Sequence, residues 1–298
     1  MALRAVRRDA QAGPWGSWEL VRAQPAPHLR AHVGGYTGWR ERTPRPVRRT
    51  ELPGVEIPLI LSFGPPTLVH STDRSDAPAR LTSFAAGLYG RAVTVGHEGE
   101  GDAVQVNLEP LAARRFLDMP LGELSHRTVE LSEILGPEAD RLVEALALAP
   151  SWEARFELLD AALTRRIGGG RPVSPDVAWA WARLAATDGQ IAVAALAAEL
   201  GCSRRHLTTR VREELGLPPK ALARVLRFRR ALGLMRAGRD WAEIAHRCGY
   251  CDQPHLNREF RDLAGATPGE LRARLLPGDG GIEPEPVPFV QDTSSALA

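Results

Sequence analysis

The sequence of 298 residues has few cysteines, no long apolar run and a single lysine. Its three cysteines all follow residue 200, which excludes a disulfide framework. The longest apolar run covers residues 191–198, eight residues where a membrane-spanning helix needs about 20. The first ten residues contain no apolar stretch typical of a secretory signal. Because 44% of the residues are apolar, full-length disorder is also excluded, and we expect a globular, cytoplasmic protein without membrane contact.

Charge is distributed unevenly along the chain. Residues 187–276 contain 16 Lys or Arg and 10 Asp or Glu, a net charge of +6. The remainder contains 22 and 26, a net charge of −4. A basic module joined to an acidic one favours nucleic acid as the partner of the basic part. Random clustering of solvated arginines stays open as an alternative, because the single lysine indicates a GC-rich codon usage.

The N-terminal half shows β-type patterns between turn residues. Residues 1–50 are rich in Pro, Gly and Arg, and we expect them to wrap a domain rather than to form one. Short β-type runs separated by glycines predict an antiparallel β-unit over residues 51–109, a small barrel or sandwich. Val104, Val106 and Leu108 alternate with polar residues, which is typical of a half-buried strand.

Three helices are predicted to follow this β-unit. Pro110 and Pro137 suit the first helical position of two of them, and Ser151 is predicted to cap the third. Three glycines at 168–170 are predicted to end that helix. The predicted organisation is an N-terminal α+β domain (1–167), a linker (168–175), an all-α domain (176–276) and a disordered tail (277–298).

The all-α region contains an internal repeat. Its first copy is Val193, Leu196, Ala197, Leu200 and Gly201, and its second, 48 residues later, is Trp241, Ile244, Ala245, Cys248 and Gly249. After one inserted residue the offset becomes 49, and five further pairs match, from Ser203 with Asp252 to Pro219 with Pro268. Each copy predicts two short helices, the first ended by glycine and the second capped by Ser203 or Asp252. This is the pattern of a helix-turn-helix motif, whose second helix enters the DNA major groove.

In each second helix the polar face lies opposite an apolar stripe. Arg, Asn and Gln are the side chains that form bidentate contacts with guanine and adenine edges. The residues predicted to read bases are Arg205, Thr208, Thr209, Gln253, Asn257 and Arg258. Arg204, Arg212 and Arg261 are predicted to contact phosphate, the last two because they lie about one turn further along the helix.

Residues 176–276 resemble the C-terminal DNA-binding domain of AraC/XylS-type transcription regulators. The resemblance is carried by LAAELGCSRRHLTTRVREELGLPPKAL, RFRRALGLM and WAEIAHRCGYCDQPHLNREFRDLAGATPGELR. It implies two helix-turn-helix motifs joined by a linking helix, here from Pro219 to about Met235, that occupy successive major-groove segments on one DNA face. The fold class predicted for the whole chain is therefore α+β, with a β-rich N-terminal unit followed by helices and an all-α C-terminal domain.

Four positions depart from the family's residue types. Val211 stands where an aromatic residue is usual, Ala192 replaces a capping Ser or Thr, and Thr209 stands where many members have arginine. Pro254 is compatible with a helix only within its first turn. Residues 90–136 also resemble the N-terminal domain of one actinobacterial branch of this family.

Catalytic and metal chemistry are not indicated. Cys248 and Cys251 have the spacing of half a zinc site, but Cys248 falls at the core position of Leu200, so a structural role is predicted. The charged loop at 97–102 contains ligand-type residues, but its flanking glycines are more typical of a solvated hairpin tip. No phosphate-binding loop, hydrolase or metalloprotease pattern occurs. We predict no catalytic residue, no metal and no cofactor.

These patterns predict a sequence-specific transcription regulator that binds double-stranded DNA and is not an enzyme. Its N-terminal domain is predicted to sense a signal, such as a small-molecule effector, or to form a homodimer, and RNA polymerase is a further possible partner. Two alternatives stay open: a constitutive regulator whose N-terminal domain only dimerises, and an N-terminal enzyme fused to a DNA-binding module. Trp15, Trp18 and Trp39 are candidates for an effector pocket, although a core role is favoured.

Overall fold

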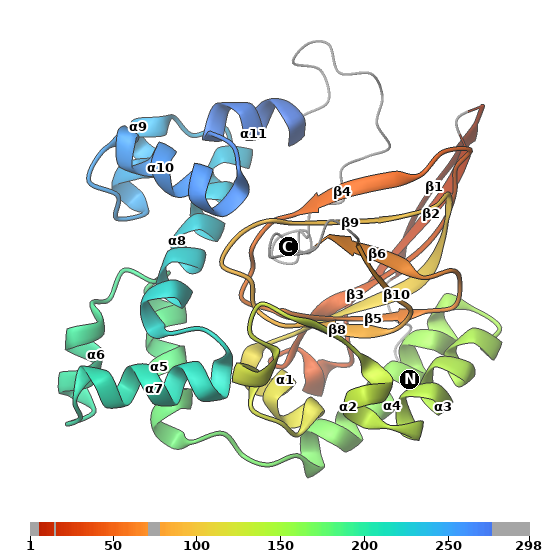
Figure 1. Ribbon diagram of the computed structural model, residues 1–298, viewed down its shortest axis with the longest axis horizontal. Helices are drawn as coiled ribbons and strands as arrows, with labels where there is room; N and C mark the ends of the chain where they lie inside the picture. Colours follow the sequence, from red (N-terminus) through yellow and green to blue (C-terminus); the bar gives the residue numbers. More distant parts are fainter. Residues whose placement is uncertain (1–5, 15, 71–77, 276–298) are drawn as a thin grey trace.

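The computed structural model describes residues 6–14, 16–70 and 78–275. Figure 1 shows a β-rich half with helices on one side of it, and a second half made of helices alone. Of the helices in the described part of the chain, none combines the length and apolar character needed to cross a bilayer. The predicted α+β class with an all-α C-terminal domain is confirmed. The tail predicted at 277–298 lies outside the described residues.

Two antiparallel sheets form the β-rich half. The larger sheet has the strand order β1-β2-β3-β10-β5-β8-β11, and the smaller has the order β4-β9-β6-β7. The strands are β1 (Val6–Gly13), β2 (Gly16–Ala23), β3 (Val33–Arg42), β4 (Val47–Glu51), β5 (Ile57–Ser62), β6 (Thr67–His70), β7 (Ala79–Leu81), β8 (Phe84–Ala86), β9 (Val93–His97), β10 (Glu100–Leu108) and β11 (Thr128–Glu130). The sandwich expected over residues 51–109 is therefore confirmed.

The expectation that residues 1–50 only wrap a domain is wrong. Strands β1 to β4 lie there, and β3 pairs directly with the central strand β10. The Pro, Gly and Arg content that favoured this expectation does not prevent strand formation here. In β3, a Cβ on Gly38 would lie 2.2 Å from the ring of Trp152, so this glycine permits a helix to approach the sheet closely.

Helices cover the outer face of the larger sheet (Figure 1). They are η1 (Pro27–Leu29), α1 (Pro110–Leu117), η2 (Leu121–Leu124), α2 (Leu131–Leu135), α3 (Pro137–Leu148) and α4 (Trp152–Gly169). The predicted starts at Pro110 and Pro137 are confirmed, and the Oγ of Ser151 accepts a hydrogen bond from the backbone N–H of Ala154 at 3.2 Å. Helix α4 continues through Gly168 and Gly169, so the glycine run does not end it before Gly170.

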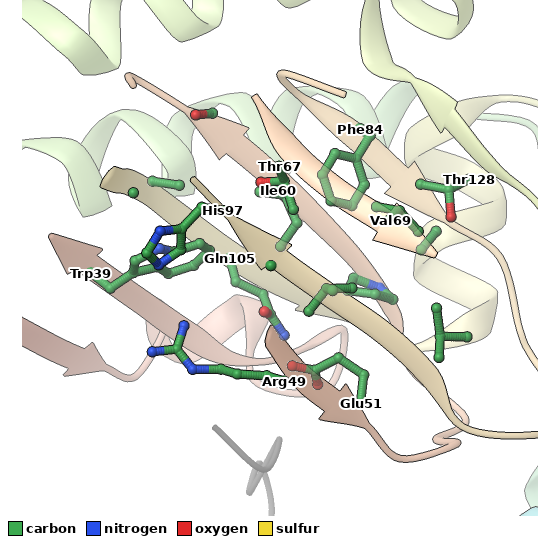
Figure 2. Close-up of a pocket in the computed structure, with 18 of the residues that line it drawn as sticks. Trp39, Arg49, Glu51, Ile60, Thr67, Val69, Phe84, His97, Gln105 and Thr128 are labelled. Carbon is green, nitrogen blue, oxygen red and sulfur yellow. The ribbon is translucent and has the colours of Figure 1, made fainter. Parts of the chain in front are cut away.

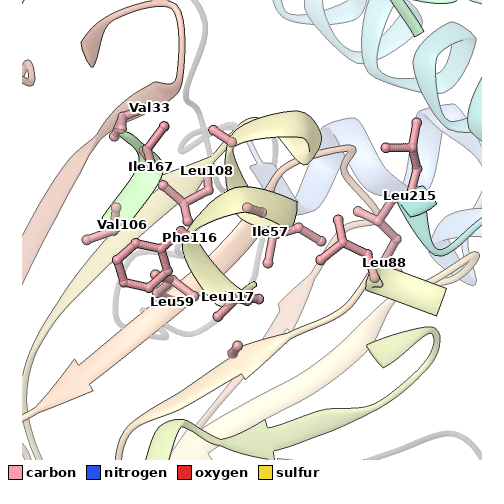
Figure 3. Close-up of a cluster of buried hydrophobic side chains, with 14 of the residues drawn as sticks. Val33, Ile57, Leu59, Leu88, Val106, Leu108, Phe116, Leu117, Ile167 and Leu215 are labelled. Atoms are coloured by element: carbon pink, nitrogen blue, oxygen red, sulfur yellow. The ribbon is translucent and has the colours of Figure 1, made fainter. Parts of the chain in front are cut away.

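The core of this half lies between the larger sheet and these helices. Figure 3 shows Phe116 and Leu117 of α1 facing Leu59, Val106 and Leu108 of the sheet. The alternation predicted for β10 is confirmed, because its apolar side chains enter this core. The polar Gln105 and Asn107 are not exposed, however. They are buried on the opposite face of the sheet, where the Nε2 of Gln105 donates to the Oδ1 of Asn107 at 2.7 Å.

The second half consists of α5 (Pro175–Ala186), α6 (Val193–Glu199), α7 (Arg204–Leu215), α8 (Pro219–Arg236), α9 (Trp241–Arg247), α10 (Gln253–Ala264) and α11 (Pro268–Leu275). The two helix pairs belong to different hydrophobic clusters. Leu207, Val211 and Leu215 of α7 share one cluster with the sandwich, whereas Phe260 belongs to a separate cluster. The first pair is thus joined to the N-terminal core. The domain limits themselves stay a prediction.

One carboxyl group between the sheet and α1 makes stability depend on pH. Burial, followed by the charge of Glu56, raises the pKa of Glu109 to about 7. Because the folded state favours the protonated acid, this stabilisation is complete below a pH of about 4.5 and is lost as the pH rises through about 7. We expect Glu109→Gln to raise the free energy of unfolding by about 1–3 kcal/mol at pH ~8 and much less at pH ~5.

Thermal denaturation of both proteins at the two pH values measures this effect. Glu98→Gln, which changes an exposed carboxyl group in the same half, is the matched control and should leave the midpoint unchanged. An equal gain at both pH values would show that Glu109 is not protonated in the fold.

Candidate nucleic-acid interface and cavity

Helices α6 and α7 form the first predicted motif. Gly201 follows α6 with a φ of 63°, a left-handed conformation that glycine adopts without strain. The Oγ of Ser203 then accepts a hydrogen bond from the backbone N–H of His206 at 3.2 Å, as predicted for a cap of α7. Leu207 and Val211 are buried, so the opposite side of α7 faces outwards.

Helices α9 and α10 repeat this geometry. The carboxylate of Asp240 caps α9, accepting from the N–H groups of Ala242 and Glu243 at 3.0 and 2.9 Å. Asp252 caps α10, and Pro254 lies within the first turn of that helix, where it removes no intrahelical hydrogen bond. Cys248 is fully buried in the second cluster, which fits the structural role predicted for it.

The polar faces of α7 and α10 present the residues that the sequence predicted to contact DNA. Seven of these are exposed: Arg204, Arg205, Thr209, Arg212, Gln253, Arg258 and Arg261. Thr208 and Asn257 are partly exposed. All nine lie on the two second helices, and their roles stay predictions.

The arginines of these faces differ from their neighbours in their ion pairs. Nearby arginines are paired with acids: Arg210 with Glu214, Arg224 with Glu259, Arg230 with Asp188 and Arg247 with Glu243. Within the described part of the chain, no salt bridge involves any of the five predicted DNA-contacting arginines: Arg204, Arg205, Arg212, Arg258 and Arg261. Uncompensated guanidinium groups are available to phosphates and guanine edges.

The β-rich half holds the C-terminal ends of both second helices. At α7, a Cβ on Gly122 of η2 would lie 2.9 Å from the carbonyl oxygen of Glu213, so the two backbones touch. At α10, the N–H of Ala92 donates to the carbonyl oxygen of Leu263 at 2.7 Å. Helix α8 joins the two motifs, and the rings of Phe228 and Phe260 meet edge to face at 4.8 Å. The sandwich therefore constrains how far apart the two second helices lie.

A cavity of about 230 Å³ lies between the two sheets (Figure 2). Apolar side chains form much of its wall, among them Ile60, Val69 and Phe84. Trp18 and Trp39 also line it, as the pocket alternative predicted, and Trp39 packs against the hydrophobic cluster of Ile60, Val69 and Phe84, as the core role predicted. Trp15 lies outside the described residues.

Charged side chains gather on the other side of the cavity (Figure 2). A guanidinium nitrogen of Arg49 donates to both carboxylate oxygens of Glu41 at 2.8 and 2.6 Å. The Nε2 of His97 lies 3.0 Å from the Oε2 of the same carboxylate. Burial by itself would raise the pKa of Glu41, but His97 and Arg49 outweigh it and hold that pKa below its ordinary value. The charge of Arg49 is thus largely neutralised within the wall.

His97 corrects the prediction of a solvated tip at 97–102. Glu98 is exposed, but His97 is buried, because the register of β9 places it opposite Val47 on the inner face of the smaller sheet. The inward alternation of Val93, Val95 and His97 was a usable signal for this orientation.

Glu51, like Glu41 and Arg49, is a charged residue of this wall that sequence reasoning missed. It lies two residues after Arg49 on β4, so both side chains face the cavity. Its Oε2 is buried and has no hydrogen-bond partner in the described part of the chain. Burial raises the pKa of Glu51 to about 7, although the charges of Arg49 and Arg229 act in the opposite direction. Arg229 belongs to α8, so the cavity wall lies close to the helix that joins the two motifs.

Two segments that line the cavity also dock the second motif. In residues 51–56, Leu52 is buried in the same cluster as Phe260, and Val55 packs against that cluster. In residues 87–93, Leu88 and Tyr89 line the cavity, while Ala92 packs against the same cluster. A change in the cavity wall can therefore reach α10 through direct contacts.

Comparison with known proteins supports this reading of the helical half. Residues 196–274 match the model of a family described as a helix-turn-helix domain. None of the curated proteins matches the chain.

Solved structures provide further similarities. The C-terminal domain of AraT, a response regulator from Geobacillus stearothermophilus, is 23% identical over 37% of this chain and 94% of that one, with a TM-score of 0.34. ToxT from Vibrio cholerae with a bound unsaturated fatty acid is 10% identical over 78% and 96% of the two chains, with a TM-score of 0.43. The AraC-like transcriptional activator CuxR is 14% identical over 78% and 95%, with a TM-score of 0.31.

Proposed function

We propose that this protein, whose C-terminal part is a DNA-binding helix-turn-helix domain of the AraC type, is a transcription regulator controlled by a small molecule in its N-terminal cavity. The observation that carries the DNA-binding part is the repeated motif with arginines that lack acidic partners. Proteins with this domain are regulators rather than enzymes, so we propose that the cavity binds its signal without converting it. Homodimerisation and contact with RNA polymerase stay predictions from the sequence.

The two polar faces are proposed to divide base reading from phosphate contact. Base edges are assigned to Arg205, Thr208, Thr209, Gln253, Asn257 and Arg258. Phosphates are assigned to Arg204, Arg212 and Arg261. The exposure of these side chains and the inward packing of Leu256 and Phe260 support the assignment, because the face opposite a buried stripe is the one that meets the groove.

Two neighbouring arginines of α10 test this division. We expect Arg258→Ala to weaken binding by about 1–3 kcal/mol and to flatten the preference at one base pair, because it removes a base-edge partner. Arg261→Ala should lower the affinity for all sequences alike, because phosphates carry no sequence information. Both variants remove one exposed arginine from the same helix, so each is the matched control of the other.

Binding profiles over a randomised DNA library measure both effects. If Arg258→Ala keeps the wild-type preference at every position, α10 does not read bases through this face.

We propose that a ligand bound in the cavity controls DNA binding by moving the cavity walls. Residues 51–56 and 87–93 face the cavity on one side and the second motif on the other. A ligand that shifts either segment would change the position of α10 relative to α7, whose end is held separately by η2. Because a ligand alters an equilibrium only by its differential affinity for two states, it must contact a wall that moves. This contact geometry favours regulation over a purely dimerising N-terminal domain.

A further inference from the structure

Most acidic groups in the cavity wall are paired with arginines. Among the described lining residues there are six carboxylates and four guanidinium groups, and Arg8 and Arg42, outside this lining, pair with two of the carboxylates. In all, the carboxylates of Glu19, Glu41, Glu100 and Asp102 lie within 4.0 Å of an arginine nitrogen. Glu51 is not among them. A carboxylate without an ion pair between apolar walls favours a cation over an anion, because the low dielectric strengthens the interaction.

Glu51 offers the acceptor for such a cation. Its Oε2 is inaccessible to solvent and accepts no hydrogen bond from the described residues. A buried carboxylate oxygen left in this state is unfavourable. Because Glu51 lines the cavity, a rotation of its side chain towards a ligand N–H⁺ group would give this oxygen a donor and remove that penalty. Arg49 and Arg229 lie near enough to influence Glu51, but Arg49 is bound to Glu41 on β3 of the other sheet.

An anion is a poorer fit to the same wall. The Nε of Arg49 is also buried without a hydrogen-bond partner, so an anionic ligand would find one donor. That donor lies on a guanidinium group already held by Glu41 and placed two residues from Glu51 on the same face of β4. An anion there would meet two carboxylates, which makes the site unfavourable for it.

The apolar wall defines the rest of the ligand. Ile60 and Phe84 of the larger sheet lie across the cavity from the sheet that carries Glu51, and Val69 lies two strands from Glu51 in that same sheet. Trp39 adds an aromatic face. Aromatic rings attract cations as well as apolar bodies. A volume of about 230 Å³ is small for a ligand pocket, which favours a body of one or two rings.

We propose that the effector is an organic ammonium ion with a compact apolar body, whose N–H⁺ group donates to Glu51. This inference rests on the proposed control of the protein by a small molecule. Glu51 is then a specificity-determining residue, and it lies where the cavity wall approaches α8 and the second motif.

Three ligands with the same ring system and different head groups test the charge. Full-length protein is titrated at pH ~8 with 1-naphthylmethylammonium, 1-naphthylmethanol and 1-naphthylacetate, and binding is followed by calorimetry. We expect the ammonium ion to bind at least about tenfold more tightly than the alcohol, and the carboxylate to bind most weakly, since a charge-assisted hydrogen bond contributes about 1.5–3 kcal/mol.

The variant Glu51→Gln tests whether Glu51 is responsible for the preference for the ammonium ion. It should lower the affinity for the ammonium ion to that of the alcohol, a loss of about tenfold or more, and leave the affinity for the alcohol unchanged. Glu51→Asp keeps the charge and should retain part of the preference. Glu98→Gln, at an exposed position of the same half, should retain all of it.

The outcomes separate this inference from the proposed function. Tightest binding of the carboxylate, or no binding by any of the three, overturns the assignment of a cationic effector. Measuring the DNA affinity with and without the bound ligand tests separately whether the cavity regulates DNA binding. An ammonium ion that binds through Glu51 without changing DNA affinity would support the ligand class and contradict the regulatory role of the cavity.

Discussion

The affinity of the full-length protein for a selected DNA fragment is expected to fall roughly 10³- to 10⁴-fold when the salt concentration rises from about 50 to about 200 mM. The helical half carries a net charge of +6, and arginines without acidic partners lie on α7 and α10. If these arginines and their neighbours neutralise about six to eight phosphates, the logarithm of affinity falls against the logarithm of salt with a slope of about −5 to −7. Fluorescence anisotropy over a salt series measures this slope.

Single variants show which arginines contribute to it. Arg212→Ala should make the slope about one unit shallower, because it removes one phosphate contact. Arg210→Ala is the matched control from the same helix, since Arg210 is paired with Glu214 and should leave the slope nearly unchanged. A wild-type slope near zero would mean that the arginines do not lie at the phosphate backbone.

Truncation of one aromatic side chain is expected to disable the second motif. Phe260 is fully buried and meets Phe228 edge to face, so Phe260→Ala should destabilise this cluster by about 3–5 kcal/mol. Its cluster is separate from the one that joins the sandwich to α7, so the loss should be concentrated in α9, α10 and the end of α8. DNA affinity should fall more than tenfold, because α10 loses its support.

Hydrogen exchange locates the damage, and denaturation measures its size. Leu148→Ala removes a large apolar side chain that is 78% exposed, and it should change stability by no more than about 0.5 kcal/mol. Wild-type exchange rates in α10 of the Phe260→Ala protein would contradict the packing described here.

The motifs of the helical half could be predicted from the sequence because the residues that define them are close together in the chain. Gly201 and Gly249 both adopt positive φ, and the caps at Ser203 and Asp252 form the predicted hydrogen bonds. Each of these features depends on residues within about one helical turn of each other, so a pattern in the sequence is enough to identify it.

The burial of residues in the sandwich was harder to predict from the sequence, for a physical reason. A period of two shows that a strand has two different faces, but it does not distinguish solvent from a cavity between two sheets. Gln105 was therefore interpreted as half-exposed and His97 as part of a solvated tip, although both are buried. In β3, Gly38 allows close contact with Trp152 of helix α4.

The sequence by itself determined the two helix-turn-helix motifs, their caps and turns, and the polar faces predicted to meet DNA. Only the tertiary structure decided that Glu41, Arg49 and His97 form one cluster, because these residues come from three strands whose pairing depends on long-range contacts. It also decided that Glu51 faces the cavity beside α8, and that η2 and Ala92 hold the ends of α7 and α10. Such contacts join residues far apart in the chain, and no local periodicity encodes them.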